Sequence, residues 1–274
     1  MIAAALLMAA LTLPDIPVGA PVDRGEFLYA RSLGRVPAGV ISLSVDSHVL
    51  FHSQALRDVR IVDPKSNQVP YLIVPLPSPV IVPLRLPSST REGKQSVYRL
   101  TLPSESLPSG TELELATTAS VFERDIVLRR PLDESRGREP DVIERLSWAS
   151  SPSLRTVLTT GRAVEVVVDD GDNAPLPIVS AKLRLPGFGL RFVSAGAPLT
   201  LLYGNPSIGE PRYDLALVSS QLLGQPARDL ALTAAPTSEP AKKQKDSRTF
   251  GIAIGVAVVV LLFVLGRLVS APRS

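Results

Sequence analysis

Proline recurs along the chain and limits the secondary structure that the chain can form. There are 26 prolines among 274 residues, against a usual share of about 5%, and they lie between short apolar runs. Because proline lacks a backbone N–H group and clashes with the preceding helical turn, this spacing disfavours long helices. Short strands joined by turns tolerate it. The pattern therefore predicts an all-β body.

Several short runs in this body have the alternation expected of strands. Residues 40–45 and 112–116 alternate apolar and polar side chains, as half-buried strands do. A charged loop over residues 133–140 separates two groups of such runs. We therefore predict one or two β-sandwich domains, with a first sandwich region over residues 21–135 and a second over residues 136–233.

The beginning of the chain has the composition of an export signal. Residues 2–13 are apolar apart from Thr12, and the stretch ends with small residues at Gly19 and Ala20. The apolar run is too short to span a membrane comfortably. It predicts a signal peptide over residues 1–20.

A second apolar segment lies near the end of the chain. Residues 250–266 contain no charged or strongly polar side chain. At about 1.5 Å per residue, a helix over residues 249–269 covers a hydrocarbon core of about 30 Å. We predict a single transmembrane helix there, followed by a cytoplasmic tail over residues 270–274.

The segment before this helix bears on its orientation. Residues 234–248 are small, polar and charged, which predicts a flexible basic tether. Their basic residues would stay in the cytoplasm by the positive-inside rule, whereas a signal peptide would export them. We expect the signal peptide to decide, which gives a single-pass protein of the inner membrane of a bacterium with a periplasmic body. The alternative is a tail-anchored protein whose body faces the cytoplasm.

Composition also excludes several classes of site. The chain has no cysteine, which excludes disulfides, thiolate metal sites and cysteine nucleophiles. Acidic and basic residues nearly balance within the body, which argues against nucleic-acid binding. Imidazole comes only from His48 and His52. We expect residues 42–51 to form a strand and a turn, in which the two Cα atoms lie about 13 Å apart, too far to share a metal.

A loop with two tyrosines is the first candidate for ligand binding. Tyr203 and Asn205 begin it, and Tyr213 and Asp214 end it. The residue types predict either a structural corner, held by turn chemistry and tyrosine hydroxyl groups, or a site where the rings stack on a sugar. Trp148 is a further candidate, either as an exposed ligand platform beside arginines or as a core residue.

An acidic run is the second candidate. Asp169, Asp170, Asp172 and Asn173 surround a glycine. Four oxygen-bearing side chains suit calcium, the only cofactor that the sequence suggests, although the spacing is not that of an EF-hand. The same residue types are also common in tight turns between strands.

The predicted membrane helix contains a GxxxG pattern. Gly251 and Gly255 would lie on one face of that helix, where small residues allow two helices to approach closely. The pattern predicts either a homodimer through the membrane helix or the ordinary use of glycine in membrane helices.

Parts of the sequence also resemble a known protein family. Residues 201–217, 169–178, 58–62 and 69–71 are similar to bacterial domain-of-unknown-function family 3999. The resemblance implies a signal peptide, a β-rich body, one C-terminal membrane helix and a membrane-protein partner, and it carries over no catalytic residue. Residues 122–148 resemble a discoidin-like sandwich, which implies a jelly-roll or galactose-binding-like domain.

Together these features predict a membrane-anchored protein of the cell envelope. We expect a non-enzymatic binding module for a membrane or envelope protein or for a glycan, with the lipid bilayer as a further partner. The alternative is a glycan-active hydrolase with paired carboxylates, for which Asp169, Asp170 and Asp172 are the first candidates.

Overall fold

The computed structural model describes the body of the chain. It covers residues 16–53, 55–131, 141–158 and 161–238. The predicted transmembrane helix, with Gly251 and Gly255, lies outside the described residues, as do residues 1–15 of the predicted signal peptide. No helix in the part of the chain described here is both long enough and apolar enough to cross a membrane.

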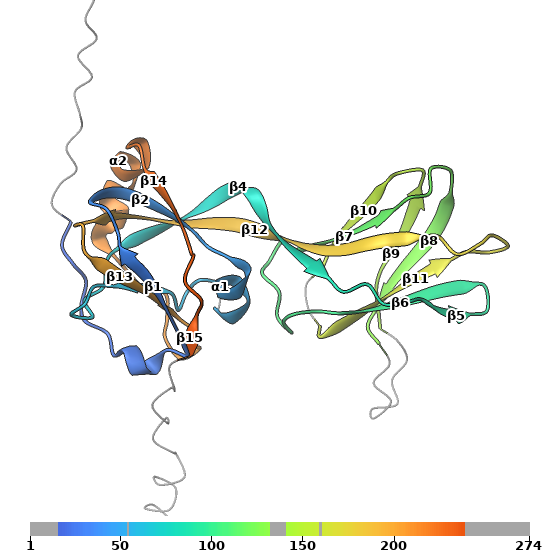
Figure 1. Cartoon of the computed structure of the whole chain (residues 1–274), viewed down its shortest axis with the longest axis horizontal. Helices are drawn as coiled ribbons and strands as arrows, with labels where there is room; N and C mark the ends of the chain where they lie inside the picture. The colour runs from blue at the N-terminus through green and yellow to red at the C-terminus, as the bar shows by residue number, and fades with distance from the viewer. Residues whose placement is uncertain (1–15, 54, 132–140, 159–160, 239–274) are drawn as a thin grey trace, which may run out of the picture.

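Two long strands form the spine of an elongated molecule with two β-rich lobes (Figure 1). They are β4 (Tyr71–Leu84) and β12 (Ile178–Ser194), which run antiparallel to each other through both lobes. We call the lobe that holds both ends of the described chain the basal lobe, and the other the distal lobe. The narrow region between them is the waist.

The sheet built on this spine is shared by the two lobes. Its order is β10-β7-β12-β2-β14, with β4 along the other side of β12. The remaining members are β2 (Gly39–Ser44), β7 (Glu112–Thr117), β10 (Ser153–Val157) and β14 (Arg228–Ala231). β7 and β10 belong to the distal lobe, whereas β2 and β14 belong to the basal lobe (Figure 1). Only β14 pairs parallel, on β2.

Each lobe has a second sheet of its own. The basal sheet contains β15 (Thr237–Ser238), β1 (Tyr29–Arg35), β13 (Pro198–Tyr203) and β3 (Arg60–Val62), in that order. The distal sheet contains β5 (Thr90–Glu92), β6 (Gln95–Thr101), β11 (Ala163–Asp169), β8 (Glu123–Arg129) and β9 (Val142–Ala149), in that order. The short helices are η1 (Arg24–Glu26), α1 (Ser47–His52), η3 (Asp214–Val218) and α2 (Ser219–Gly224).

The spine is interrupted at the waist. The pairing of β4 with β12 shifts register between Leu185 and Gly187. A Cβ atom on Gly187 would lie 2.2 Å from the carbonyl oxygen of Ser78, so the two backbones approach too closely there for any side chain. Pro77 and Pro79 lie in this unpaired stretch of β4, where the lack of a proline N–H group removes no hydrogen bond between the strands.

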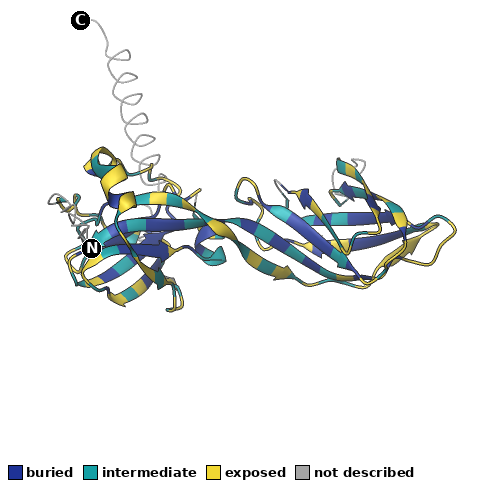
Figure 2. Cartoon of the chain, turned by 90° about the horizontal axis from the view of Figure 1, so that it is seen from above, coloured by how far each residue is buried: buried dark blue, intermediate teal, exposed yellow. Residues whose placement is uncertain are grey.

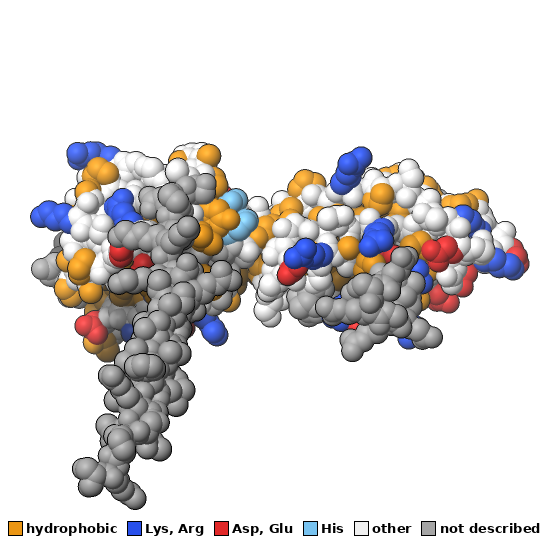
Figure 3. Space-filling view, turned by 90° about the horizontal axis from the view of Figure 1, so that it is seen from below, with side chains coloured by type: hydrophobic (Ala, Val, Ile, Leu, Met, Phe, Trp, Pro, Cys, Tyr) orange, Lys and Arg blue, Asp and Glu red, His pale blue; other side chains and the backbone are white. Residues whose placement is uncertain are grey.

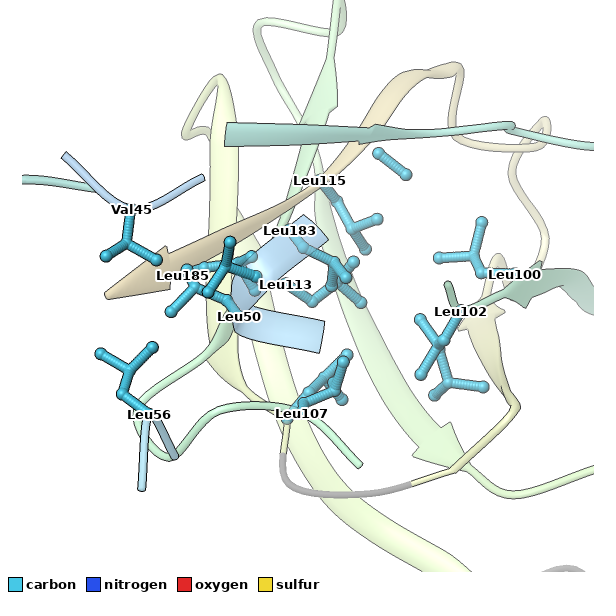
Figure 4. Close-up of a cluster of buried hydrophobic side chains, with 14 of the residues drawn as sticks. Val45, Leu50, Leu56, Leu100, Leu102, Leu107, Leu113, Leu115, Leu183 and Leu185 are labelled. Carbon is cyan, nitrogen blue, oxygen red and sulfur yellow. The ribbon is translucent and has the colours of Figure 1, made fainter. Parts of the chain in front are cut away.

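One buried apolar cluster extends through both lobes. It includes Leu43 and Ile61 in the basal lobe, and Leu100 and Leu113 in the distal lobe. Figure 2 shows buried residues along the strands of both lobes, and Figure 4 shows part of the cluster, where Leu56 lies near residues of the shared sheet. The lobes therefore do not have separate hydrophobic cores.

The predicted β-rich body is confirmed, but its division into regions is different. The expected boundary between residues 135 and 136 lies outside the described residues, and β8 and β9 on either side of it pair with each other. The chain enters the distal lobe along β4 and leaves it along β12, so the distal lobe is an insertion within the basal lobe. Local patterns did not reveal this pairing, because β4 and β12 are far apart in sequence.

The last residues of the predicted signal peptide contact the body. Gly19 donates its backbone N–H to the carbonyl oxygen of Gln68 at 2.7 Å, and Gln68 donates its own to Ala20 at 3.3 Å. This pairing is continued by an antiparallel bridge between Pro21 and Asn67.

A ladder of charges lies across the distal half of the shared sheet. Glu114 on β7 lies directly opposite Arg155 on β10 and Lys182 on β12. Its carboxylate accepts from Arg155 Nε at 2.7 Å and pairs with Lys182 Nζ at 2.8 Å. The hydrogen bond from Lys182, together with that from Arg155 and against the effect of burial, lowers the pKa of Glu114.

We predict that Glu114→Gln destabilises the protein at neutral pH but much less in acid. The loss is about 1 to 3 kcal/mol at pH 7, because three cations, Arg155, Lys182 and Arg184, would lose a buried partner. A carboxyl group with a lowered folded-state pKa stabilises the fold above its unfolded-state pKa of 4.5, and this contribution is lost as the pH falls through the folded-state value. Urea denaturation at pH 7 and pH 3, followed by circular dichroism, measures both free energies.

Glu112→Gln is the matched control on the same strand. The side chain of Glu112 is 41% exposed and meets Arg184 at 3.3 Å, so we expect a loss below about 1 kcal/mol. Equal losses for the two variants, or the same loss for Glu114→Gln at both pH values, would contradict this account.

Candidate functional site

A groove at the waist lies next to the candidate side chains. Its volume is about 680 Å³. One wall comes from the end of α1 and the turn that follows it, and another from residues 106–109 of the distal lobe. Ile73 on β4 and Phe188 on β12 also line it. Grooves between lobes are common places for ligands to bind.

The groove combines apolar walls with a few polar groups. Phe51, Ile73 and Leu107 supply apolar surface. Arg57 is exposed at the groove. The hydroxyl oxygen of Ser53 is buried and makes no hydrogen bond with the described part of the chain. Buried polar groups are nearly always paired in folded proteins, so a turn of this side chain toward the groove, which Ser53 lines, would give its hydroxyl group a partner in a bound ligand.

The turn between α1 and β3 has an unusual backbone. Ala55 has φ 50° and Leu56 has φ 64°, two consecutive residues other than glycine in the left-handed region. Each costs roughly 1 to 3 kcal/mol, and such strain is concentrated at functional sites. Leu56 is only 2% exposed, so burial of its side chain holds the turn in this conformation. The strained turn forms part of the groove wall.

Helix α1 brings the two histidines together. Asp46 caps it, because its Oδ1 atom accepts from the backbone N–H of Val49 at 3.1 Å. His48 and His52 are therefore one helical turn apart, with ring centroids separated by 4.1 Å and planes inclined by 17°. Of the strand and turn expected over residues 42–51, the strand is confirmed up to Ser44, but the turn is wrong, because Ser47–His52 form a helix. Asp46 was the available signal, since Asp is a preferred N-cap residue.

Two tyrosines complete a cluster around these histidines. The hydroxyl group of Tyr203 lies 2.9 Å from His48 Nδ1, and His52 Nδ1 lies 2.8 Å from the carbonyl oxygen of His48. Tyr29 packs edge-on against both imidazole rings and stacks on Tyr203. Burial, and then the neighbouring His52, lowers the pKa of His48 against the opposing effect of Asp46. Burial raises the pKa of Tyr203 to about 12, so its hydroxyl group stays protonated.

A buried arginine ties this cluster to the end of the described chain. Arg31 on β1 pairs with the carboxylate of Asp46, and its side chain is only 6% exposed. Its Nε atom donates to the carbonyl oxygen of Ala234 at 2.8 Å. The cap of α1 is thus linked to the segment that leads into β15. Figure 3 shows the histidines, in pale blue, at the surface of the basal lobe beside the waist.

The predicted ligand residues do not meet at one surface. Tyr203 and Asn205 are buried in the basal lobe, whereas Trp148 is buried in the distal lobe, where its Nε1 atom donates to Ser151 at 2.9 Å. The hydroxyl group of Tyr213 donates to Gln68 Oε1 at 2.9 Å. Asp214 is exposed at the start of η3. A shared sugar platform is therefore not formed.

The loop that begins at Tyr203 is a structural corner. Asp58 is 1% exposed, and its Oδ2 atom accepts from the backbone N–H groups of Gly204 and Asn205 at 2.7 and 2.8 Å. Gly204 has φ +88°, and a Cβ atom there would lie 2.8 Å from Tyr29 Cδ2. The corner therefore requires glycine and places Tyr29 against the histidines.

The acidic run is also a hydrogen-bonded turn. The fully buried carboxylate of Asp170 accepts from Ser96 Oγ at 2.6 Å and from Arg91 Nη1 at 2.7 Å. Asp172 is 91% exposed and pairs with Lys94. Asp169 accepts from the N–H of Gly171, and the Asn173 amide donates to the Asp170 carbonyl oxygen.

This turn does not fit the predicted calcium site. Arginine and serine already occupy the carboxylate of Asp170, and the other acidic side chains do not converge on it. Within the described ranges, no group of three or more His, Cys, Asp or Glu residues could hold a metal ion. The geometry is that of a tight turn.

We predict that Gly204→Ala lowers the free energy of unfolding by at least about 1 to 3 kcal/mol, because alanine is strained at this φ and its Cβ atom collides with Tyr29. Gly209→Ala, in the same loop, is the control. No heavy atom lies within 4 Å of the added Cβ atom there, so its effect should stay within about 0.5 kcal/mol. Urea denaturation measures both, and indistinguishable effects would refute the requirement for glycine.

Comparisons with protein-family models and with curated proteins identify no relative of this chain. No protein-family model matches the chain, and no curated protein matches it. The resemblance to family 3999 therefore stays a prediction, and the function has to be inferred from the geometry of the site.

Proposed function

We propose that the protein is a membrane-anchored envelope protein that binds a polypeptide segment of a membrane or envelope partner in its waist groove. The observation that supports this most directly is the apolar groove between two lobes, lined also by Ser53, whose buried hydroxyl group makes no hydrogen bond with the described residues. A polypeptide supplies both apolar side chains and backbone carbonyl oxygens, which match the walls and the hydroxyl group.

The aromatic residues favour a polypeptide over a glycan. Tyr203 and Trp148 are both at most 1% exposed, in different lobes, so neither ring can stack on a sugar at the surface. Phe51 and Phe188 line the groove as half-buried rings among aliphatic side chains. Such a surface suits leucine-like or aromatic anchors of a peptide.

The position of the groove also suits a partner in the membrane. The last described strand, β15, pairs Ser238 with Tyr29, and Tyr29 contacts His52 at the groove. Only the ten residues 239–248 separate this strand from the predicted membrane helix over residues 249–269. Fully extended, ten residues span at most about 36 Å. The groove would therefore stay close to the membrane surface, on the periplasmic side if the signal peptide is used.

The proposal also includes the type of β-sandwich in each lobe. In each lobe, the lobe's own sheet lies over one half of the shared sheet (Figure 1). This layering supports two β-sandwiches, and we propose that they are of jelly-roll or galactose-binding-like type and are carried by one membrane helix.

The hydrolase alternative gains no support from the aspartates first considered. Asp170 is bonded to Arg91 and Ser96, and Asp172 pairs with Lys94 on an exposed turn. Neither is placed as a proton donor or acceptor opposite a second free carboxylate, as glycosidases require.

We predict that a photoreactive amino acid at position 73 crosslinks one membrane or envelope protein in intact cells, whereas the same residue at position 81 does not. Ile73 is 37% exposed in the groove, and Ile81 is 46% exposed on the same strand but does not line the groove. Mass spectrometry of the crosslinked band identifies the partner. Similar crosslinking at both positions would argue against the groove.

An arginine in the groove tests the same contact without crosslinking chemistry. Ile73→Arg should reduce co-purification of the identified partner by about tenfold or more, since an unpaired cation would be buried against apolar walls. Ile81→Arg is its control. Membrane anchoring is tested separately: a full-length chain that remains in the supernatant after high-speed centrifugation would overturn that part of the proposal.

A further inference from the structure

We propose that His48 and His52 form a two-imidazole site for a borderline divalent transition-metal ion, with Cu²⁺ the strongest ligand and Zn²⁺ a weaker one. The proposal rests on the cluster around α1 and is independent of any partner in the groove. It uses both histidines of the chain, so the described fold brings all of its imidazole groups to one place.

The spacing of the two histidines suits one ion. The residues are four positions apart on α1, and their rings lie nearly parallel with centroids separated by 4.1 Å. Residues at this spacing project from the same helical face, as in the paired histidines of helical metal sites. Because each Nε2 lone pair lies in the plane of its ring, the two rings would have to turn toward each other to hold one ion about 2.0 to 2.1 Å from each nitrogen.

Hydrogen bonds at the inner nitrogens leave the outer nitrogens for a metal. His52 Nδ1 lies 2.8 Å from the His48 carbonyl oxygen, to which it donates. His48 Nδ1 lies 2.9 Å from the Tyr203 hydroxyl oxygen, which accepts when the imidazole is protonated at Nδ1. In these tautomers each Nε2 atom carries a free lone pair. Hydrogen bonds from the nitrogen that does not bind the metal usually accompany metal-binding histidines, because they fix the tautomer and the ring orientation.

The surroundings hold the rings in place and limit the local charge. The ring centroid of Tyr29 lies 5.0 Å from that of His48 and 4.8 Å from that of His52. Arg31 is a buried cation on β1 that acts on His48, and its guanidinium group is paired with Asp46.

The chemistry of the donors selects the class of ion. Imidazole suits Cu²⁺, Zn²⁺ and Ni²⁺, whereas Ca²⁺ and Mg²⁺ prefer oxygen ligands. Cu²⁺ binds most tightly in the usual order of divalent ions. Two protein ligands leave other coordination positions to water. His52 is exposed and also lines the waist groove, so the ion would be accessible from solvent at the groove mouth.

The test is a titration of the full-length chain in detergent, purified without a histidine tag. Calorimetry with Cu²⁺ in competing glycine buffer should give one ion per chain, and Ca²⁺ should give no heat. His52→Gln removes a ligand and should weaken Cu²⁺ binding by about tenfold or more, because loss of a group that only hydrogen-bonds to a ligand often costs that much. Asp169→Asn, in the acidic turn of the distal lobe, is the control and should bind like the wild type.

Electron paramagnetic resonance of the Cu²⁺ complex gives a structural readout. The wild type should show coupling to two imidazole nitrogens, and His52→Gln should show coupling to one. His48→Gln provides a second variant, and circular dichroism of both variants without metal shows whether they fold. The proposal is overturned if folded His52→Gln or His48→Gln binds Cu²⁺ as tightly as the wild type, or if the wild-type spectrum lacks two nitrogen couplings.

Discussion

The pairing of β4 with β12 is the constraint on which the rest of the structure depends. These strands have 14 and 17 residues and pass through both lobes. The far edge of β12 carries β7 in the distal lobe and β2 in the basal lobe. A change in their register would therefore displace strands in both lobes at once, because each residue shift moves every side chain to the other face.

The waist follows from this pairing. Between Gly189 and Leu190 the buried positions of β12 change from odd to even numbers, so the core-facing side of the strand reverses between the lobes. Such a reversal needs strong local twist, and the register shift beside Gly187 supplies an irregularity of the kind that increases it. The groove lies where this irregularity separates α1 from the loop over residues 106–109. Its walls are thus positioned by the spine, although neither wall belongs to it.

Local sequence patterns revealed the strands but not their partners. Residues 40–45 and 112–116 coincide with the strands β2 and β7, as predicted, and both strands lie in the shared sheet. Residues 178–194 look like two strands, because the apolar alternation loses its phase near Pro186, yet they form one strand. The change of the apolar positions from odd to even residue numbers is visible in the sequence, but only the pairing with β4 explains it. Pairing between distant segments is set by the whole core, which local periodicity does not contain.

The candidate site was harder to foresee for a related reason. His48 and His52 were excluded as a pair because an extended chain would separate them, and the single N-cap at Asp46 reverses that conclusion. Tyr203 was singled out either as a corner residue held through its hydroxyl group or as a ligand residue, but its contact with His48 was not foreseen. Its partner Tyr29 lies 174 positions away on β1 and had no local signal.

One short segment connects the histidines with the groove. Residues 46–58 begin at the cap of α1 and end at Asp58, which holds the corner of Gly204 and Asn205. Between these anchors lies the strained turn at Ala55 and Leu56. Full burial of a leucine side chain contributes about 1.5 to 3 kcal/mol, which is similar to the cost of one strained residue. The turn therefore persists because both of its ends and its central side chain are fixed, and this fixes the face of α1 and the groove wall together.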